Sequence, residues 1–148
     1  GVVLEQKAYL FLGKSGTGKS THARQWMSAF PGCTLLNDDN PAIRIEEGKI
    51  FAYGTPWSGK TPCYKNERYP VAGIVRLSQA KGNKFTLLSG TEAFAALLPS
   101  CSSIRQDARL QESLIGTLIE ITETVPVGKM ECLPDTDAAK VCYKGLQI

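Results

Sequence analysis

A group of residues near the start of the chain has the types and the spacing needed to bind a polyphosphate. The spacing is Gly-x-x-x-x-Gly-Lys-Ser, and the residues are Gly13, Lys14, Ser15, Gly16, Thr17, Gly18, Lys19 and Ser20. Glycines allow the backbone to curl so that its N–H groups point at phosphate oxygens, and the start of a helix favours negative charge. The Lys19 ammonium suits the β- and γ-phosphates, and the Ser20 hydroxyl suits Mg²⁺. The pattern predicts a phosphate-binding loop (P-loop) for a nucleoside triphosphate with Mg²⁺, and we expect Thr21 to cap the following helix or to contact the α-phosphate.

Two adjacent acids provide the next candidates. Asp38 and Asp39 follow a short predicted strand and precede Pro41. One carboxylate can hold Mg²⁺, directly or through water, and the other can accept a proton from a substrate hydroxyl. Both acids are therefore candidates for catalysis and for metal binding, beside Lys19 and Ser20, and the sequence does not say which acid has which role. The alternative is that the pair only forms an acidic turn, since Asn, Asp and Pro favour turns.

Other side chains have both a functional and a structural interpretation. His22, the only histidine, directly follows the P-loop, and a structural role is favoured because the first helical turn directs it away from the phosphates. Trp57 could stack on a nucleotide base or anchor its loop on the core. Lys60, Lys65 and Arg68 could neutralise charge on the γ-phosphate or bind an acidic substrate, or they could form a hydrated loop surface.

The predicted secondary structure places the P-loop between a buried strand and a helix. The continuous apolar run at 7–12 indicates a strand buried on both faces, and helical spacing from 19 to 30 ends at Pro31-Gly32. The next strand, 33–36, leads into the two acids. The remaining patterns predict a hairpin at 42–45 and 49–53, a long loop at 54–70, strands at 71–77, 84–88 and 127–133, and helices at 91–98, 107–124 and from Pro134-Asp135 to about 143. This order predicts a three-layer α/β fold with a mixed central sheet, in which the P-loop and the acids lie at the carboxyl ends of neighbouring strands.

Composition narrows the class of protein. The chain has 148 residues, a net charge of +3 and 43% hydrophobic residues, which predicts one nucleotide-binding domain over 1–148. Its five cysteines form no Cys-x-x-Cys pair, which is typical of free thiols and predicts a cytoplasmic location. No apolar run approaches the roughly 20 residues of a membrane-spanning helix, so no membrane partner is expected. The basic residues are scattered and not interleaved with aromatics, so no nucleic-acid partner is expected.

With these residues in place, the chain resembles the C-terminal catalytic domain of HPr kinase/phosphorylase, a P-loop fold shared with ATP-dependent phosphoenolpyruvate carboxykinase. Nearly the whole chain fits, but three segments carry the resemblance: the P-loop, the turn Asn37-Asp38-Asp39 where that family has paired aspartates, and 54–60, which looks like the Gly-Thr-Pro-Trp-Ser-Gly element of HPr-kinase-like bacterial proteins. The resemblance implies ATP as the nucleotide and a serine or another hydroxyl as the acceptor. HPr kinases usually have glutamate where this chain has Thr21, and their Leu-Glu-x-Arg-Gly run has no counterpart in 69–77. A kinase for a target other than HPr is therefore expected.

Two functions are compatible with these features. The first is an ATP- and Mg²⁺-dependent, kinase-like phosphotransferase that acts on a serine or a small-molecule hydroxyl, with Asp38 or Asp39 as the base. The second is an ATP-binding regulatory module that transfers no phosphate. In the family that the chain resembles, a histidine lies before the P-loop strand, and because the sequence starts at Gly1, we expect part of the site to lie upstream. The sequence leaves open which hydroxyl-bearing substrate or protein is the acceptor and whether copies of the chain form a homo-oligomer.

Overall fold

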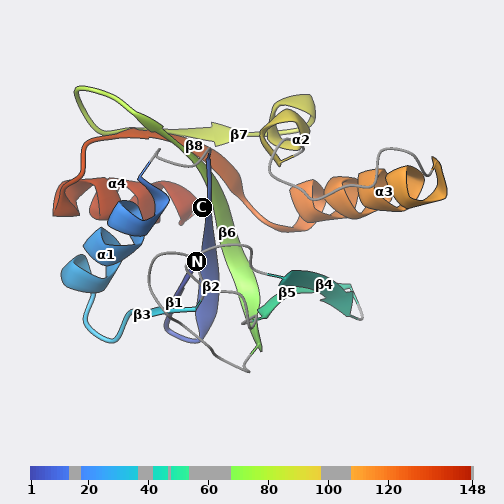
Figure 1. Cartoon of the computed structure of the whole chain (residues 1–148), viewed down its shortest axis with the longest axis horizontal. Coiled ribbons are helices and arrows are strands. Elements are labelled where there is room, and N and C mark those ends of the chain that lie inside the picture. Colours follow the sequence, from blue (N-terminus) through green and yellow to red (C-terminus); the bar gives the residue numbers. More distant parts are fainter. Residues whose placement is uncertain (14–17, 37–41, 47, 54–67, 98–107, 148) are drawn as a thin grey trace.

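The computed structural model describes residues 1–13, 18–36, 42–46, 48–53, 68–97 and 108–147 (Figure 1). The helices are α1 (Lys19–Ala29), α2 (Thr91–Leu97), α3 (Ala108–Thr124) and α4 (Thr136–Leu146). The strands are β1 (Val2–Leu4), β2 (Lys7–Leu12), β3 (Thr34–Leu35), β4 (Ala42–Glu46), β5 (Lys49–Tyr53), β6 (Arg68–Gln79), β7 (Lys84–Leu88) and β8 (Val127–Cys132). The described chain is therefore an α/β protein.

Strand β6 organises the sheet because it pairs with three other strands. It runs parallel to β2 and β8 and antiparallel to β5. Along one edge its first residues pair with β5 and its later residues with β8, so the β4–β5 hairpin and the β7–β8 pair are attached to the same long strand. Along the other edge the order continues through β2 and β1 to β3. The sheet is open and mixed, and the mixed sheet predicted from the sequence is confirmed.

Alternating side chains of β2 divide the core into two parts, one on each face of the sheet. Ala8 and Leu10 belong to the part that includes residues of α2 and α3, whereas Tyr9 and Phe11 belong to the part that includes residues of α1 and α4. Figure 1 shows the same separation, with α1 and α4 on one side of β2 and β6 and α2 and α3 on the other. Because helices cover both faces, β2 is buried on both, and this explains its continuous apolar run.

Most elements lie where the sequence patterns predict them. Strands β2, β5 and β7 have the predicted bounds, and α1, β4 and β8 differ from theirs by one residue. Helices α2 and α3 match their predictions within the described residues, and the predicted end at 98 and start at 107 lie outside them. Strand β6 is longer than the predicted 71–77 because its first residues, 68–70, pair with β5 and its last residues, 78–79, pair with β8. Helix α4 continues past the predicted end to Leu146.

The sequence patterns do not predict the first strand, β1. It forms a hairpin with β2 in which Val2 pairs with Tyr9 and Leu4 with Lys7. The two residues of the turn, Glu5 and Gln6, have φ values of 52° and 64°. Positive φ at both positions belongs to a hairpin turn that usually contains Asn or Gly. Because this turn contains neither, the sequence carries no local sign of it.

Candidate nucleotide site

Strand β2 leads into the P-loop pattern, and α1 begins within it (Figure 1). Strand β2 ends at Leu12, and α1 begins at Lys19, so that Lys19, Ser20 and Thr21 all lie in the first turn of the helix. Gly13 and Gly18 are described on the two sides, and the residues between them, Lys14 to Thr17, lie outside the described residues. The structure thus contains the strand and the helix that the sequence predicts on either side of the loop.

The last glycine of the pattern has a conformation that few other residues adopt. Gly18 is the N-cap of α1 and has a φ of 98° and a ψ of 26°. Among the described residues, nothing lies within 4 Å of a Cβ atom added at Gly18, so contacts with them do not require glycine at this position. The positive φ does, because a side chain makes this backbone conformation unfavourable.

Strand β3 carries the chain toward the same edge of the sheet. Both β2 and β3 pair antiparallel with β1, so β2 and β3 run in the same direction. After β3, the backbone N–H of Leu36 donates to the carbonyl of Gly1 at 3.0 Å. Asp38 and Asp39 follow, but they lie outside the described residues. The prediction that the P-loop and the acids follow neighbouring strands is wrong in one respect, because β1 lies between β2 and β3.

His22 is buried in the core and does not face solvent. Its side chain is 3% exposed, and the indole Nε1–H of Trp26 donates to its Nε2 at 3.0 Å. The Phe11 ring stands nearly perpendicular to the imidazole, with ring centroids 4.7 Å apart. Burial lowers the pKa of His22 to about 4, because it disfavours the charged imidazolium. The neutral, buried side chain agrees with the structural role predicted from the sequence.

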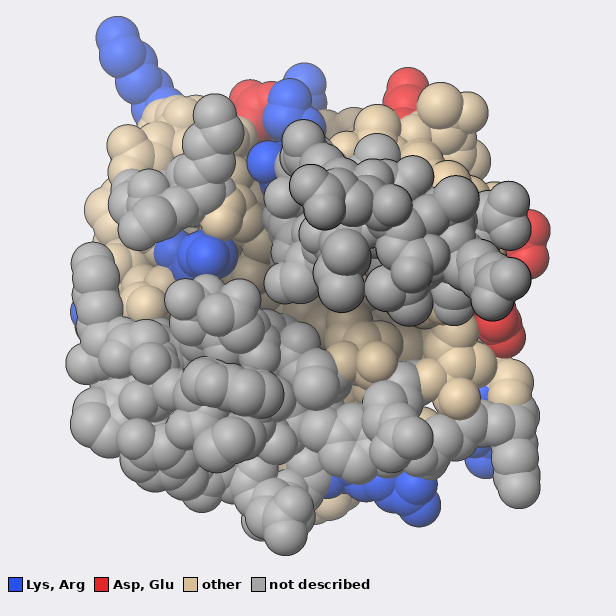
Figure 2. Space-filling model, turned by 45° about the vertical axis from the view of Figure 1, so that its right-hand side comes forward, with Lys and Arg blue, Asp and Glu red and all other residues tan. Residues whose placement is uncertain are grey.

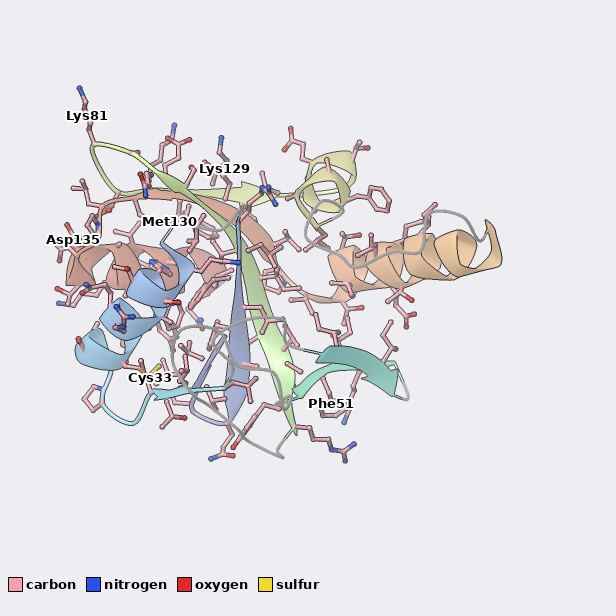
Figure 3. All side chains as sticks on the ribbon, viewed as in Figure 1. Cys33, Phe51, Lys81, Lys129, Met130 and Asp135 are labelled. Carbon is pink, nitrogen blue, oxygen red and sulfur yellow. The ribbon has the colours of Figure 1, made fainter. Side chains whose placement is uncertain are left out.

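Arg68 lies far from the P-loop edge. It begins β6, at the end of the strand that pairs with β5, and its guanidinium lies 4.8 Å from the centre of the Phe51 ring. Figure 3 shows Phe51 and Lys129 at opposite ends of the sheet, and Lys129 pairs with Arg76. At about 3.3 Å per residue, Arg68 is roughly 26 Å along the strand from Arg76. The interpretation that Arg68 neutralises the γ-phosphate is therefore wrong. Trp57, Lys60 and Lys65 lie outside the described residues.

Arg76 is a cation near the P-loop that the sequence patterns do not identify. In the parallel pair β2–β6 it is the partner of Leu12, the last residue of β2. Its Nη1 donates to the carbonyl of Ala96 in α2 at 3.1 Å, where it interacts favourably with the helix C-terminus. A charged residue inside the apolar run 71–77 is the sequence feature that could have drawn attention to it.

The described side chains form no complete metal site. Among the residues that the structure describes, no three His, Cys, Asp or Glu side chains gather where they could hold a metal ion. Cys33, Cys132 and Cys142 are free thiols, and burial raises the pKa of the Cys142 thiol. These three agree with the prediction of free thiols, and they are not metal ligands within the described part of the chain.

The described part of the chain has no helix that could span a membrane, and its Lys and Arg side chains form no patch on the face drawn in Figure 2. Within the described residues, no helix is long and apolar enough to cross a membrane. On that face, the described Lys and Arg side chains lie at separate places (Figure 2). This distribution agrees with the scattered basic residues of the sequence.

Comparisons with protein-family models, with curated proteins and with solved structures find no match to the chain. Function is therefore inferred from the residues themselves and from the elements that hold them.

Proposed function

We propose that the chain binds ATP with Mg²⁺ and transfers the γ-phosphate to a serine or a small-molecule hydroxyl, on a P-loop fold of the HPr kinase/phosphoenolpyruvate carboxykinase type. The observation that carries the proposal is the complete Gly-x-x-x-x-Gly-Lys-Ser pattern between a buried strand and a helix. The left-handed Gly18 at the start of α1 supports it, because P-loops use glycine where the backbone must curl toward phosphate.

The chemistry of the residues suits ATP and Mg²⁺. Lys19 and Ser20 open α1, where an ammonium group and a hydroxyl stand beside backbone N–H groups that favour anions. Hydroxyl and carboxylate oxygens are ligands that Mg²⁺ prefers, and Ser20, Asp38 and Asp39 supply both kinds. When bound, Mg²⁺ would neutralise charge on the β- and γ-phosphates.

The proposed reaction gives the two acids different roles. One of Asp38 and Asp39 binds the metal, and the other accepts the proton of the substrate hydroxyl. The hydroxyl oxygen then forms a bond to the γ-phosphorus while the bond between that phosphorus and the β–γ bridging oxygen breaks, and ADP leaves. Lys19 stabilises the negative charge on the phosphates during the transfer. Strand β3 runs in the same direction as β2 and ends shortly before the two acids in the sequence, which supports this assignment.

A nucleotide-binding module without phosphate transfer is the second candidate. The burial of His22, the only histidine in the sequence, favours this candidate. Because His22 is buried and accepts a hydrogen bond from Trp26, it is not available as a general base. Catalysis by this chain would therefore depend on the two aspartates.

Transfer of label from γ-labelled ATP distinguishes the two candidates. The protein is incubated with γ-labelled ATP, Mg²⁺ and a panel of serine-containing peptides and hydroxylated small molecules, and ATP binding is measured in parallel. Labelling of an acceptor that is lost in Asp38→Asn or Asp39→Asn, while one of these variants still binds ATP, is the result that we expect. Binding of ATP by the wild type without labelling of any acceptor would favour the regulatory module. Absence of both binding and labelling would contradict both candidates.

A further inference from the structure

We propose that His22 is a positioning residue of the nucleotide site, because its buried imidazole ties the strand that enters the P-loop to the helix that leaves it. The inference rests on the proposed function above. His22 does not touch the nucleotide in this account. It acts through Lys19 and Ser20, which it holds in place relative to β2.

The contacts of His22 join both ends of the loop. Phe11 lies two residues before Gly13 and meets the imidazole edge to face, with ring centroids 4.7 Å apart and an interplanar angle of 88°. On the helix, the Trp26 indole N–H donates to His22 Nε2 at 3.0 Å. The Trp26 ring also lies 5.4 Å from the Phe11 ring. The three side chains therefore form a closed triangle between β2 and α1.

This triangle determines how α1 is rotated about its axis. Trp26 is fully buried, and its ring also packs on Tyr9 of β2 and on Tyr143 of α4. The backbone N–H of His22 donates to the carbonyl of Gly18 at 2.8 Å, so His22 and Gly18 belong to the same helical turn. Lys19 and Ser20 lie in that turn, and any rotation at His22 moves them relative to the end of β2. A displacement of about 1 Å in an active site can lower a rate about 100-fold.

An apolar residue could not replace His22 in this triangle. The part of the chain that the structure describes contains no buried side-chain nitrogen or oxygen without a hydrogen-bond partner. An aliphatic side chain at position 22 would leave the indole N–H of Trp26 buried without an acceptor, which is unfavourable. Glutamine can supply an acceptor at a similar distance from the backbone, so it is the conservative substitution.

Affinity for Mg²⁺-ATP, measured by isothermal titration calorimetry, tests the inference in four proteins. They are the wild type, His22→Leu, His22→Gln and Leu146→Ala, a control that removes buried side-chain volume in α4, away from the loop. Circular dichroism identifies a temperature at which all four are folded. We expect His22→Leu to bind about 10-fold more weakly, whereas His22→Gln and Leu146→Ala stay within about 3-fold of the wild type.

The possible outcomes separate this inference from the proposed function. If the wild type does not bind Mg²⁺-ATP, both are wrong. If the wild type binds and folded His22→Leu binds equally well, or no more weakly than Leu146→Ala, only the role of His22 is wrong. Should His22→Leu fail to fold, Trp26→Phe removes the indole donor and keeps an aromatic ring. It is expected to weaken binding about 3- to 10-fold, and wild-type affinity in that variant would overturn the inference.

Discussion

Replacing Gly145 with alanine is expected to destabilise the protein, although alanine is the better helix former. Gly145 lies in α4, where that helix packs on the ring of Phe85 from β7. A Cβ atom at Gly145 would overlap this ring, with Cγ of Phe85 only 2.5 Å away. The ring also lies against Gly128 of β8, since a Cβ atom added there would overlap Cζ and Cε2 of Phe85. The ring therefore has little room to move toward the sheet. Phe85 thus fills the space that the two glycines leave.

The expected magnitude follows from two opposing effects. Alanine gains at most about 1 kcal/mol of helix propensity over glycine. Overpacking a core typically costs about 1–3 kcal/mol, and the overlap at Gly145 reaches the base of the Phe85 ring, so a cost near the upper end is expected. The net loss in free energy of unfolding is therefore about 2 kcal/mol. For a domain of this size it corresponds to a decrease in Tm of roughly 4–8 °C.

Gly116→Ala in α3 is the matched control. Gly116 is an exposed helical glycine, and among the described residues nothing lies within 4 Å of an added Cβ, so the same substitution should stabilise the protein by up to about 1 kcal/mol. Urea unfolding followed by circular dichroism measures both variants. Phe85→Leu should also recover part of the loss caused by Gly145→Ala, because it removes the overlapping ring atoms. Equal effects of the two alanine substitutions, or no recovery with Phe85→Leu, would refute the packing of Phe85 described above.

Three further predictions concern His22, the start of α4 and the acids. Because burial lowers the pKa of His22 from 6.5 to about 4, the unfolded state binds a proton more readily, and about 3 kcal/mol of stability should be lost as the pH falls from about 6.5 to about 4. Asp135→Ala should reduce the free energy of unfolding by about 1–2 kcal/mol, because Asp135 caps α4 by accepting from the Ala138 N–H at 2.9 Å. Asp38→Asn and Asp39→Asn should differ in kind: loss of the metal ligand weakens Mg²⁺-ATP binding, whereas loss of the base spares binding and slows transfer roughly 10²- to 10⁴-fold.

Each of these predictions has its own measurement. Urea unfolding at pH 7 and pH 4.5 should show a smaller pH dependence for His22→Gln than for the wild type, and equal dependence would contradict the burial of a neutral imidazole. For Asp135→Ala, Asp137→Ala is the control, since Asp137 is an exposed residue of the same helical turn, and equal losses would argue against the cap. For the acids, calorimetry measures binding and labelling measures transfer. If binding and transfer are unchanged in both asparagine variants, Asp38 and Asp39 have no role in the site and only form an acidic turn.

The local elements could be predicted because their patterns are strong. The apolar run of β2 ends at a glycine pattern, and the stripe of Leu118 and Ile121 in α3 is buried as its helical spacing predicts. Such signals depend on residues that are near one another in the sequence.

The pairing of distant strands could not be predicted in the same way. That β1 lies between β2 and β3 depends on a turn at Glu5-Gln6 without glycine. The position of Arg68 depends on how far β6 extends and on its pairing with β5. Arg76, in turn, comes next to the end of β2 only through the parallel register of β2 and β6. Roles for Asp38 and Asp39 remain predictions, since both lie outside the described residues.

Thermal unfolding with and without Mg²⁺-ATP tests nucleotide binding at the P-loop most directly. Lys19→Ala removes the ammonium proposed to hold the phosphates, and Lys140→Ala removes an exposed lysine of α4 as a control. A ligand present at 100 times its Kd stabilises the native state by about 2.7 kcal/mol, so the Tm of the wild type should rise by roughly 5–10 °C. Lys140→Ala should show the same rise and Lys19→Ala none. No rise in the wild type at millimolar ATP, or an equal rise in Lys19→Ala, would contradict the proposed nucleotide site.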